Sequence, residues 1–98
     1  MQSARGSVAG PGDELDIAFY GLSTCIWCKR ARQFLESHRI GFRYVYVDLL
    51  PHQERENVLA EVRARCFGPS VSFPTVVVDG RACVQGYHPD QLGEVLGL

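Results

Sequence analysis

The sequence is organised around the stretch Ser23-Thr24-Cys25-Ile26-Trp27-Cys28-Lys29-Arg30. It follows a segment whose apolar residues alternate as in a β-strand, and it opens a segment with the spacing of an amphipathic helix. Cys25 is therefore expected at the first turn of a helix, where unpaired backbone N–H groups and the helix dipole favour a thiolate. Cys28 lies three residues further on, close enough on a helix to form a disulfide with Cys25. A C-x-x-C pair in this context is typical of a redox-active dithiol.

The composition of the chain argues against several other classes of protein. Its 98 residues, 46% of them hydrophobic, suit a single domain that folds without a disulfide scaffold. The net charge of −1 gives no reason to expect binding to nucleic acids or to a membrane surface. No secretion signal is visible, and no apolar run reaches the about 20 residues that span a bilayer. We therefore expect a cytoplasmic protein that works as a monomer.

The pattern along the chain predicts an α/β domain. Residues 1–13 are rich in glycine and small residues and predict a flexible leader, followed by a domain over 14–98. Strands are expected at 15–20, 42–47, 73–78 and 81–84, and helices at 25–38, 51–66 and from 89 onward. Ser23 or Thr24 is expected to cap the first helix, and Asp79-Gly80 indicates a type I′ hairpin. The order βαβαββα predicts a four-stranded mixed sheet flanked by three helices.

The predicted first helix separates the two cysteines by role. Cys28 shares an apolar stripe with Ala31 and Leu35, so its thiol is expected to face the core. Cys25 lies at the exposed tip of the helix. Lys29 and the neighbouring arginines lie where cations oppose the helix dipole, but the same cations stabilise an adjacent thiolate. The alternative is that these residues only form a solvated basic face of the helix. We therefore expect Cys25 to attack a substrate disulfide and Cys28 to resolve the mixed disulfide.

These motifs together resemble those of the glutaredoxins, a family with the thioredoxin fold. The resemblance rests on Cys25 and Cys28 after the first strand, on Phe73-Pro74-Thr75 before the third, and on Gly86 after the hairpin. It covers residues 15–98 and implies that the hairpin runs antiparallel to the first two strands. It also implies that Pro74 is cis and packs beside the cysteines, and that the backbone of Phe73 binds a peptide or glutathione as an added strand.

Three features depart from the common glutaredoxin pattern. Ile26 and Trp27 replace Pro and Tyr between the cysteines, and Leu22 replaces a lysine that usually contacts a carboxylate of glutathione. Residues 85–90, Gln-Gly-Tyr-His-Pro-Asp, replace the Gly-Gly-x-Asp-Asp that usually binds the γ-glutamyl end. This segment is instead similar to that of small glutaredoxin-like redoxins that accept electrons from thioredoxin reductase. The resemblance therefore leaves the electron donor open between glutathione and a thioredoxin reductase-type system.

The expected function is that of a dithiol oxidoreductase that reduces protein disulfides or glutathione mixed disulfides through Cys25 and Cys28. The candidate substrate-binding residues are Trp27, Lys29, Phe73, Pro74, Gly86 and Tyr87. Trp27 could equally be a partly buried surface residue, and Tyr87 could simply pack under the last helix. No bound cofactor is expected, although glutathione could serve as the reductant. The alternative function is an iron–sulfur carrier that holds its cluster between two copies through Cys25 and glutathione.

The cysteines allow further interpretations. A C-x-x-C can be half of a zinc site, but no second cysteine or histidine pair follows, so no metal site is predicted. Cys66 and Cys83 fall at a helix end and in a strand, where we expect them to act as small buried hydrophobic residues. A regulatory disulfide at either position is the alternative.

Overall fold

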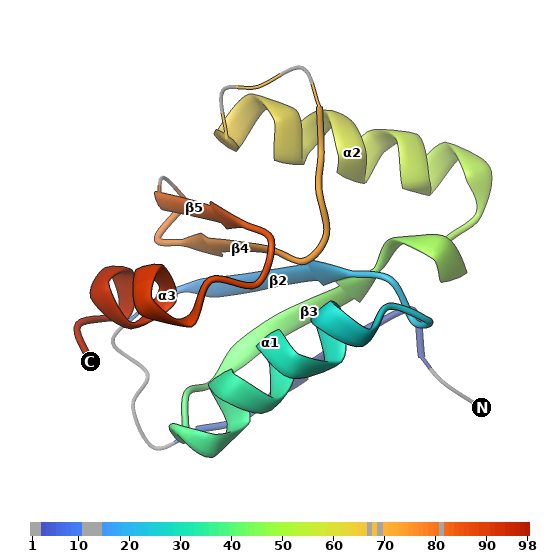
Figure 1. Ribbon diagram of the computed structural model, residues 1–98. Coiled ribbons are helices and arrows are strands. Elements are labelled where there is room, and N and C mark those ends of the chain that lie inside the picture. The colour runs from blue at the N-terminus through green and yellow to red at the C-terminus, as the bar shows by residue number, and fades with distance from the viewer. Residues whose placement is uncertain (1–2, 11–14, 67, 69, 81) are drawn as a thin grey trace.

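The computed structural model describes residues 3–10, 15–66, 68, 70–80 and 82–98, which form a sheet with helices on both faces (Figure 1). The strands are β1 (Arg5–Val8), β2 (Ile17–Gly21), β3 (Phe42–Tyr46), β4 (Thr75–Val78) and β5 (Ala82–Gln85). The helices are α1 (Ile26–Ser37), α2 (His52–Cys66) and α3 (Pro89–Leu96), and a 3₁₀ turn, η1, covers Val47–Leu49. The ends of the predicted elements therefore lie within two residues of the observed ones.

The strand order of the sheet is β1-β3-β2-β4-β5. Strands β2 and β3 are parallel and are joined through α1, whereas β4 pairs antiparallel with both β2 and β5. The hairpin between β4 and β5 turns at Asp79 and Gly80, whose φ angles of 53° and 72° are both positive, as a type I′ turn requires. The predicted fold class, an α/β fold with a mixed sheet, is confirmed.

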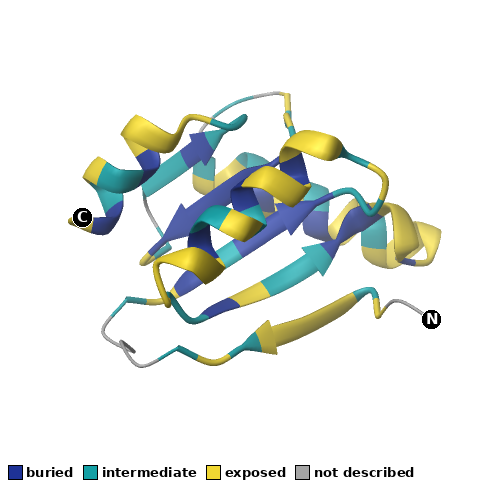
Figure 2. Cartoon of the chain, turned by 60° about the horizontal axis from the view of Figure 1, so that its bottom comes forward, coloured by how far each residue is buried: buried dark blue, intermediate teal, exposed yellow. Residues whose placement is uncertain are grey.

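Within the described part of the chain the sheet has five strands, so the predicted number of four is wrong. The additional strand, β1, lies within the segment for which a flexible leader is predicted, and it pairs antiparallel with β3 from Arg5–Val45 to Val8–Phe42. Its residues are mostly exposed (Figure 2), so the backbone pairing, and not burial of an apolar face, defines it. An exposed edge strand of this kind has no alternating hydrophobic pattern from which a sequence could reveal it.

The sheet separates two hydrophobic cores. Helices α1 and α3 cover one face, and α2 covers the other (Figure 1). The first core contains the buried residues Ile17, Phe19, Cys28, Ala31, Leu35, Phe42, Tyr46, Val76, Val78, Val84, Leu92 and Leu96. The second core contains Tyr20, Val47, Leu50, Val58, Val62 and Val77, and Cys66 and Cys83 pack at its margin. Within the described ranges, no helix has both the length and the apolar character needed to cross a membrane.

Candidate active site

The strand register places three chain segments side by side at the carboxyl end of β2. Tyr20 pairs with Thr75, and Thr75 pairs with Gln85. Extending this register by one residue aligns Gly21, Pro74 and Gly86 in one row across β2, β4 and β5. The Gly86 N–H donates a hydrogen bond to the Pro74 carbonyl, with an N···O distance of 2.7 Å. The Phe73–Pro74 peptide bond is cis, as the resemblance implies. Because Gly21 is the last residue of β2, the cysteine-containing segment leaves the sheet at this row.

Cys25 forms the N-cap of α1, a role that the sequence analysis assigned to Ser23 or Thr24. Its backbone is extended, and its Sγ accepts a hydrogen bond from the Cys28 N–H at 3.2 Å. This N–H is one of the unpaired donors at the positive end of the helix, so it is placed to stabilise a thiolate. Cys25 is half-buried, which leaves its sulfur within reach of a substrate.

Cys28 faces the first core, as its position on the apolar stripe predicts, and is only 1% exposed. Its Sγ accepts a hydrogen bond from the Leu22 N–H at 3.4 Å. Burial is the largest cause that raises the pKa of the Cys28 thiol from 9.0 to about 12, and a side-chain hydrogen bond between the Cys28 and Cys25 sulfurs contributes in the same direction. At neutral pH Cys28 is therefore held as a protonated thiol.

Gly21 allows α1 to approach the end of β2 closely. A Cβ atom at this position would lie 2.9 Å from the ring of Phe19 and 3.3 Å from the Cβ atom of Cys28. The missing side chain at Gly21 thus leaves the space in which Cys28 packs against the sheet.

Asp48, in η1, anchors the loop between β2 and α1. Its carboxylate accepts hydrogen bonds from both the backbone N–H and the hydroxyl of Ser23, the former at 2.8 Å. Although Asp48 is exposed, the slight desolvation of its carboxylate acts to raise its pKa, but these hydrogen bonds outweigh this effect and hold the pKa below its usual value. The ionised carboxylate also contributes to the raised pKa of Cys28. Asp48 is not recognisable from the sequence as part of the site, because 25 residues separate it from Ser23 and no local motif connects them.

Trp27 and Tyr87 form an aromatic pair beside the cysteines. The Trp27 ring is 54% exposed and stacks on the Tyr87 ring with 6.1 Å between centroids and 22° between planes. The Arg30 guanidinium lies 5.5 Å from the Trp27 ring centroid, and the neighbouring Ile26 is 58% exposed. Exposed apolar side chains next to Cys25 offer a surface on which a peptide could pack.

The remaining candidate residues differ in their surroundings. Phe73 is half-buried and packs against both cores, whereas Pro74 is fully buried, so a substrate would meet the backbone beside it. Gly86 has a φ of 88°, and a Cβ there would lie 2.9 Å from the His88 ring. Lys29 is exposed on α1 and is near the cysteines only because it follows Cys28 in the same helix. The structure thus groups all the candidates except Lys29 around one row of the sheet.

Cys66 and Cys83 form a disulfide, so the expectation that they act as small buried hydrophobic residues is wrong. Their Cα atoms lie 5.6 Å apart, and both residues are half-buried. The bond joins the last residue of α2 to β5 across 17 positions of the chain. The hairpin turns β5 back beneath the end of α2, and this tertiary contact is what brings the two cysteines together.

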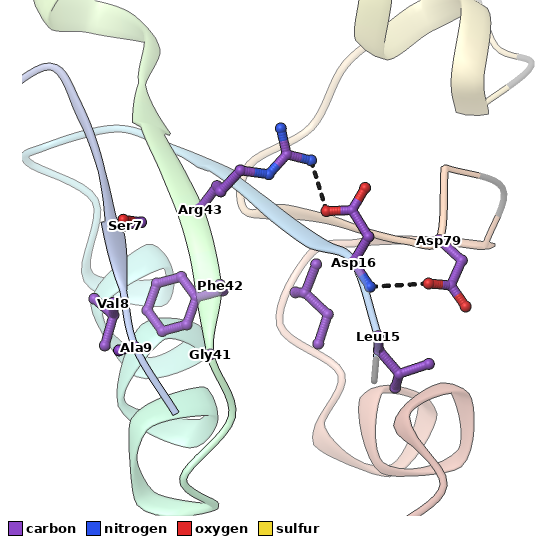
Figure 3. Close-up of a pocket in the computed structure, with 10 residues that line it drawn as sticks. Ser7, Val8, Ala9, Leu15, Asp16, Gly41, Phe42, Arg43 and Asp79 are labelled. Carbon is purple, nitrogen blue, oxygen red and sulfur yellow. Dashed lines mark hydrogen bonds and ion pairs between the residues drawn. The ribbon is translucent and has the colours of Figure 1, made fainter. Parts of the chain in front are cut away.

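A cavity of about 490 Å³ lies at the opposite end of the sheet, where β2 and β3 begin (Figure 3). Arg43 and Asp16 form an ion pair of 2.9 Å at its wall, and Asp79 accepts a hydrogen bond from the Asp16 N–H at 2.9 Å. The cavity is lined in part by residues that flank 11–14, a segment outside the described residues. None of the described residues around it is a cysteine, so it is separate from the candidate active site.

Comparison with known proteins decides the family. A family model described as Glutaredoxin matches residues 17–83. The chain belongs to the glutaredoxin family. The resemblance inferred from the motifs is thereby confirmed, and the Cys25–Cys28 pair is consistent with a C-x-x-C site of this family. A search of curated proteins gave no match.

Solved structures give the same assignment. The chain is 37% identical to the glutaredoxin from Methanosarcina mazei Go1, which it matches with a TM-score of 0.88 over 99% of this chain and 91% of that one. Its identity to methanoredoxin from Methanosarcina acetivorans is 40%, with a TM-score of 0.78 and 85% of each chain covered. For a glutaredoxin from Archaeoglobus fulgidus the identity is 34% and the TM-score 0.74, over 86% of this chain and 88% of that one. This glutaredoxin is therefore a thiol–disulfide redox protein of the thioredoxin-like fold.

Proposed function

We propose that this glutaredoxin is a dithiol oxidoreductase that reduces protein disulfides, and glutathione mixed disulfides as a second substrate class. The observation that supports this most is the asymmetry between the half-buried cap residue Cys25 and the buried Cys28. The Cys25 thiolate attacks one substrate sulfur, forming a mixed disulfide and releasing the other as a thiol. Cys28 then gives up its proton and attacks the Cys25 sulfur, so the substrate leaves with two electrons and the chain carries a Cys25–Cys28 disulfide.

The raised pKa of Cys28 sets the order of these two steps. A thiol with a pKa of about 12 is almost entirely protonated at neutral pH and competes poorly for a substrate disulfide. Cys25 accordingly reacts first. Once Cys25 is in a mixed disulfide, Cys28 lies one helical turn away, with its backbone N–H already directed at the Cys25 sulfur. The second step is therefore intramolecular and needs little rearrangement.

The surface beside Cys25 supports a protein substrate. The stacked rings of Trp27 and Tyr87 and the exposed Ile26 present apolar side chains on which a peptide can pack next to Cys25. As the resemblance to the glutaredoxins implies, we propose that the backbone of Phe73, next to the buried Pro74, pairs with an extended peptide as an added strand. We therefore propose that an extended segment of the target protein binds across this row with its disulfide facing Cys25.

For the electron donor, we propose a thioredoxin reductase-type system. Leu22 stands where glutaredoxins commonly have a lysine, and it is half-buried against the second core. It therefore offers no charge to a glutathione carboxylate, and the segment 85–90 lacks the usual acidic pair that follows two glycines. Reduced glutathione is thus expected to be a weak donor. A reducing compartment such as the cytoplasm suits a dithiol of this kind, and we propose that the chain works there as a monomer.

A coupled assay tests both the reaction and its donor. The protein is given a disulfide-bonded substrate together with either glutathione and glutathione reductase or thioredoxin reductase with NADPH. We expect faster turnover with thioredoxin reductase. The matched variant Leu22→Lys can extend its ammonium to the surface and should raise only the rate with glutathione. Equal rates with both donors in the unaltered chain would contradict the proposed donor, and no turnover with either would contradict the reaction.

The iron–sulfur alternative stays a prediction. It requires glutathione to supply cluster ligands beside Cys25, and the described features around Leu22 and Gly86 support glutathione binding less well than peptide binding. Visible absorbance after anaerobic purification with glutathione, together with a dimer in solution, would support the alternative. A colourless monomer under the same conditions would count against it.

A further inference from the structure

The Cys66–Cys83 disulfide closes a loop that contains part of the candidate active site. The closed loop spans 17 positions and includes the chain before β4, Pro74, β4 itself and the hairpin turn. Gly86, which donates its N–H to the Pro74 carbonyl, follows only three residues after Cys83. Both of the segments that face the catalytic cysteines from β4 and β5 are therefore tied to the end of α2 through this one bond.

The disulfide and the catalytic pair lie on opposite faces of the sheet. Cys66 and Cys83 pack against the second core, beneath α2, whereas Cys28 is buried in the first core, beneath α1. The sheet stands between them, so the Cys25–Cys28 pair cannot exchange with this disulfide within one molecule. Because Cys66 and Cys83 are both half-buried, an external thiolate can approach them from the solvent.

From this placement we propose that Cys66 and Cys83 form a second redox site, a dithiol–disulfide couple whose oxidised form fixes the Pro74 segment for substrate binding. Its reaction partner is a protein dithiol or a small dithiol. One thiolate of the partner attacks the Cys66–Cys83 bond to form a mixed disulfide, and its second thiol resolves that intermediate. The partner becomes a disulfide, and Cys66 and Cys83 gain two electrons and two protons.

Reduction removes one restraint and leaves others in place. The hydrogen bond between Gly86 and Pro74 and the one from the Thr75 hydroxyl to the Ser72 carbonyl do not depend on the disulfide. The fold is therefore expected to persist, while the junction between α2 and the hairpin loosens. Since the Pro74 segment lies inside the opened loop, substrate binding should weaken, but the chemistry of Cys25, which lies on another element, should not change.

The first experiment isolates the second site from the catalytic one. In the full chain carrying Cys25→Ser and Cys28→Ser, the thiols of Cys66 and Cys83 are counted by alkylation and mass spectrometry across buffers of reduced and oxidised dithiothreitol, well below the melting temperature. We expect a reversible change between no thiols and two. A bond that stays intact until the chain unfolds, or that never forms, would overturn the proposal. This outcome is independent of the proposed function, because the variant has no catalytic cysteine.

The second experiment measures the effect on the active site, and it rests on the proposed function. The double variant Cys66→Ala and Cys83→Ala is compared with the protein in which the Cys66–Cys83 disulfide is intact and Cys25 and Cys28 are reduced. We expect a Tm lower by about 15 °C, as the opening of a loop of this length implies. We also expect a higher KM for a protein disulfide with an unchanged alkylation rate of Cys25. An unchanged KM would overturn the proposed link to Pro74, whereas a lack of turnover in both proteins would refute the proposed function instead.

Discussion

The raised pKa of Cys28 makes the stability of the reduced protein depend on pH. Burial, with smaller contributions from Cys25 and Asp48, moves this pKa from 9.0 to about 12, so the unfolded chain ionises Cys28 at a lower pH than the folded chain does. The stabilisation is therefore complete below pH 9 and is lost as the pH rises from 9 towards 12. The difference of about 3 units, from 12 − 9.0, corresponds to at most about 4 kcal/mol, at roughly 1.4 kcal/mol per unit.

The variant Cys28→Ser isolates this contribution. Serine keeps the size of the side chain and a hydrogen-bond acceptor for the Leu22 N–H, but it does not titrate. The free energy of unfolding of both reduced proteins is measured in urea at a series of pH values. Relative to the variant, the unaltered protein should lose up to about 1.4 kcal/mol per pH unit above pH 9. Titration of groups that do not interact with Cys28 is shared by the two proteins and cancels in the difference. Cys25 interacts with Cys28, so the comparison is repeated in a Cys25→Ser background.

Two results would refute this reasoning. A difference in unfolding free energy that stays constant through pH 12 would show that the fold does not hold Cys28 protonated. An unaltered protein that becomes more stable relative to the variant as the pH rises would show that the fold stabilises the Cys28 thiolate. Either result would also remove the physical basis for the order of the two steps. With the shift of about 3 units, the ionised fraction of Cys28 at neutral pH is lowered about 1000-fold.

Three further substitutions test other parts of the site. Asp48→Asn should slow turnover several-fold and lower the free energy of unfolding by only about 1 kcal/mol, because Asp48 is exposed. Ser23→Ala removes only the hydroxyl donor and should have smaller effects in the same kinetic and urea assays. A larger effect of Ser23→Ala than of Asp48→Asn would contradict the role of Asp48. Trp27→Ala should raise KM for a protein disulfide and leave the rate with a small disulfide unchanged; equal effects would argue against the Trp27–Tyr87 surface. Gly21→Ala should lower stability by about 1–3 kcal/mol in calorimetry through crowding at Cys28, and an unchanged Tm would disprove that crowding.

The features that the sequence predicts correctly are those set by neighbouring residues. Asp79 and Gly80 specify the type I′ turn because both positions favour a positive φ, and the apolar stripe of α1 places Cys28 against the core. The C-x-x-C pair at the junction of β2 and α1 follows from the same local reasoning. The residues that make up each of these patterns lie within a few positions of one another. The patterns can therefore be recognised without knowledge of the tertiary structure.

The features that the sequence analysis missed depend on distant parts of the chain. Strand β1 is defined by its pairing with β3 and by little burial of its own. Cys66 and Cys83 come together only because the hairpin lies beneath the end of α2. Asp48 meets Ser23 because β3 is parallel to β2 and ends at the same edge of the sheet. Each of these contacts requires the arrangement of the elements, which no local pattern encodes.

The most direct test of the central claim is to trap the mixed disulfide. In a background with Cys66→Ala and Cys83→Ala, the variants Cys28→Ser and Cys25→Ser are each incubated with a disulfide-bonded peptide and analysed by intact mass. We expect a stable adduct of one peptide chain on Cys25 in the Cys28→Ser variant and none in the Cys25→Ser variant. An adduct on Cys28 in the Cys25→Ser variant, or no adduct on Cys25, would contradict the assignment of nucleophile and resolving thiol.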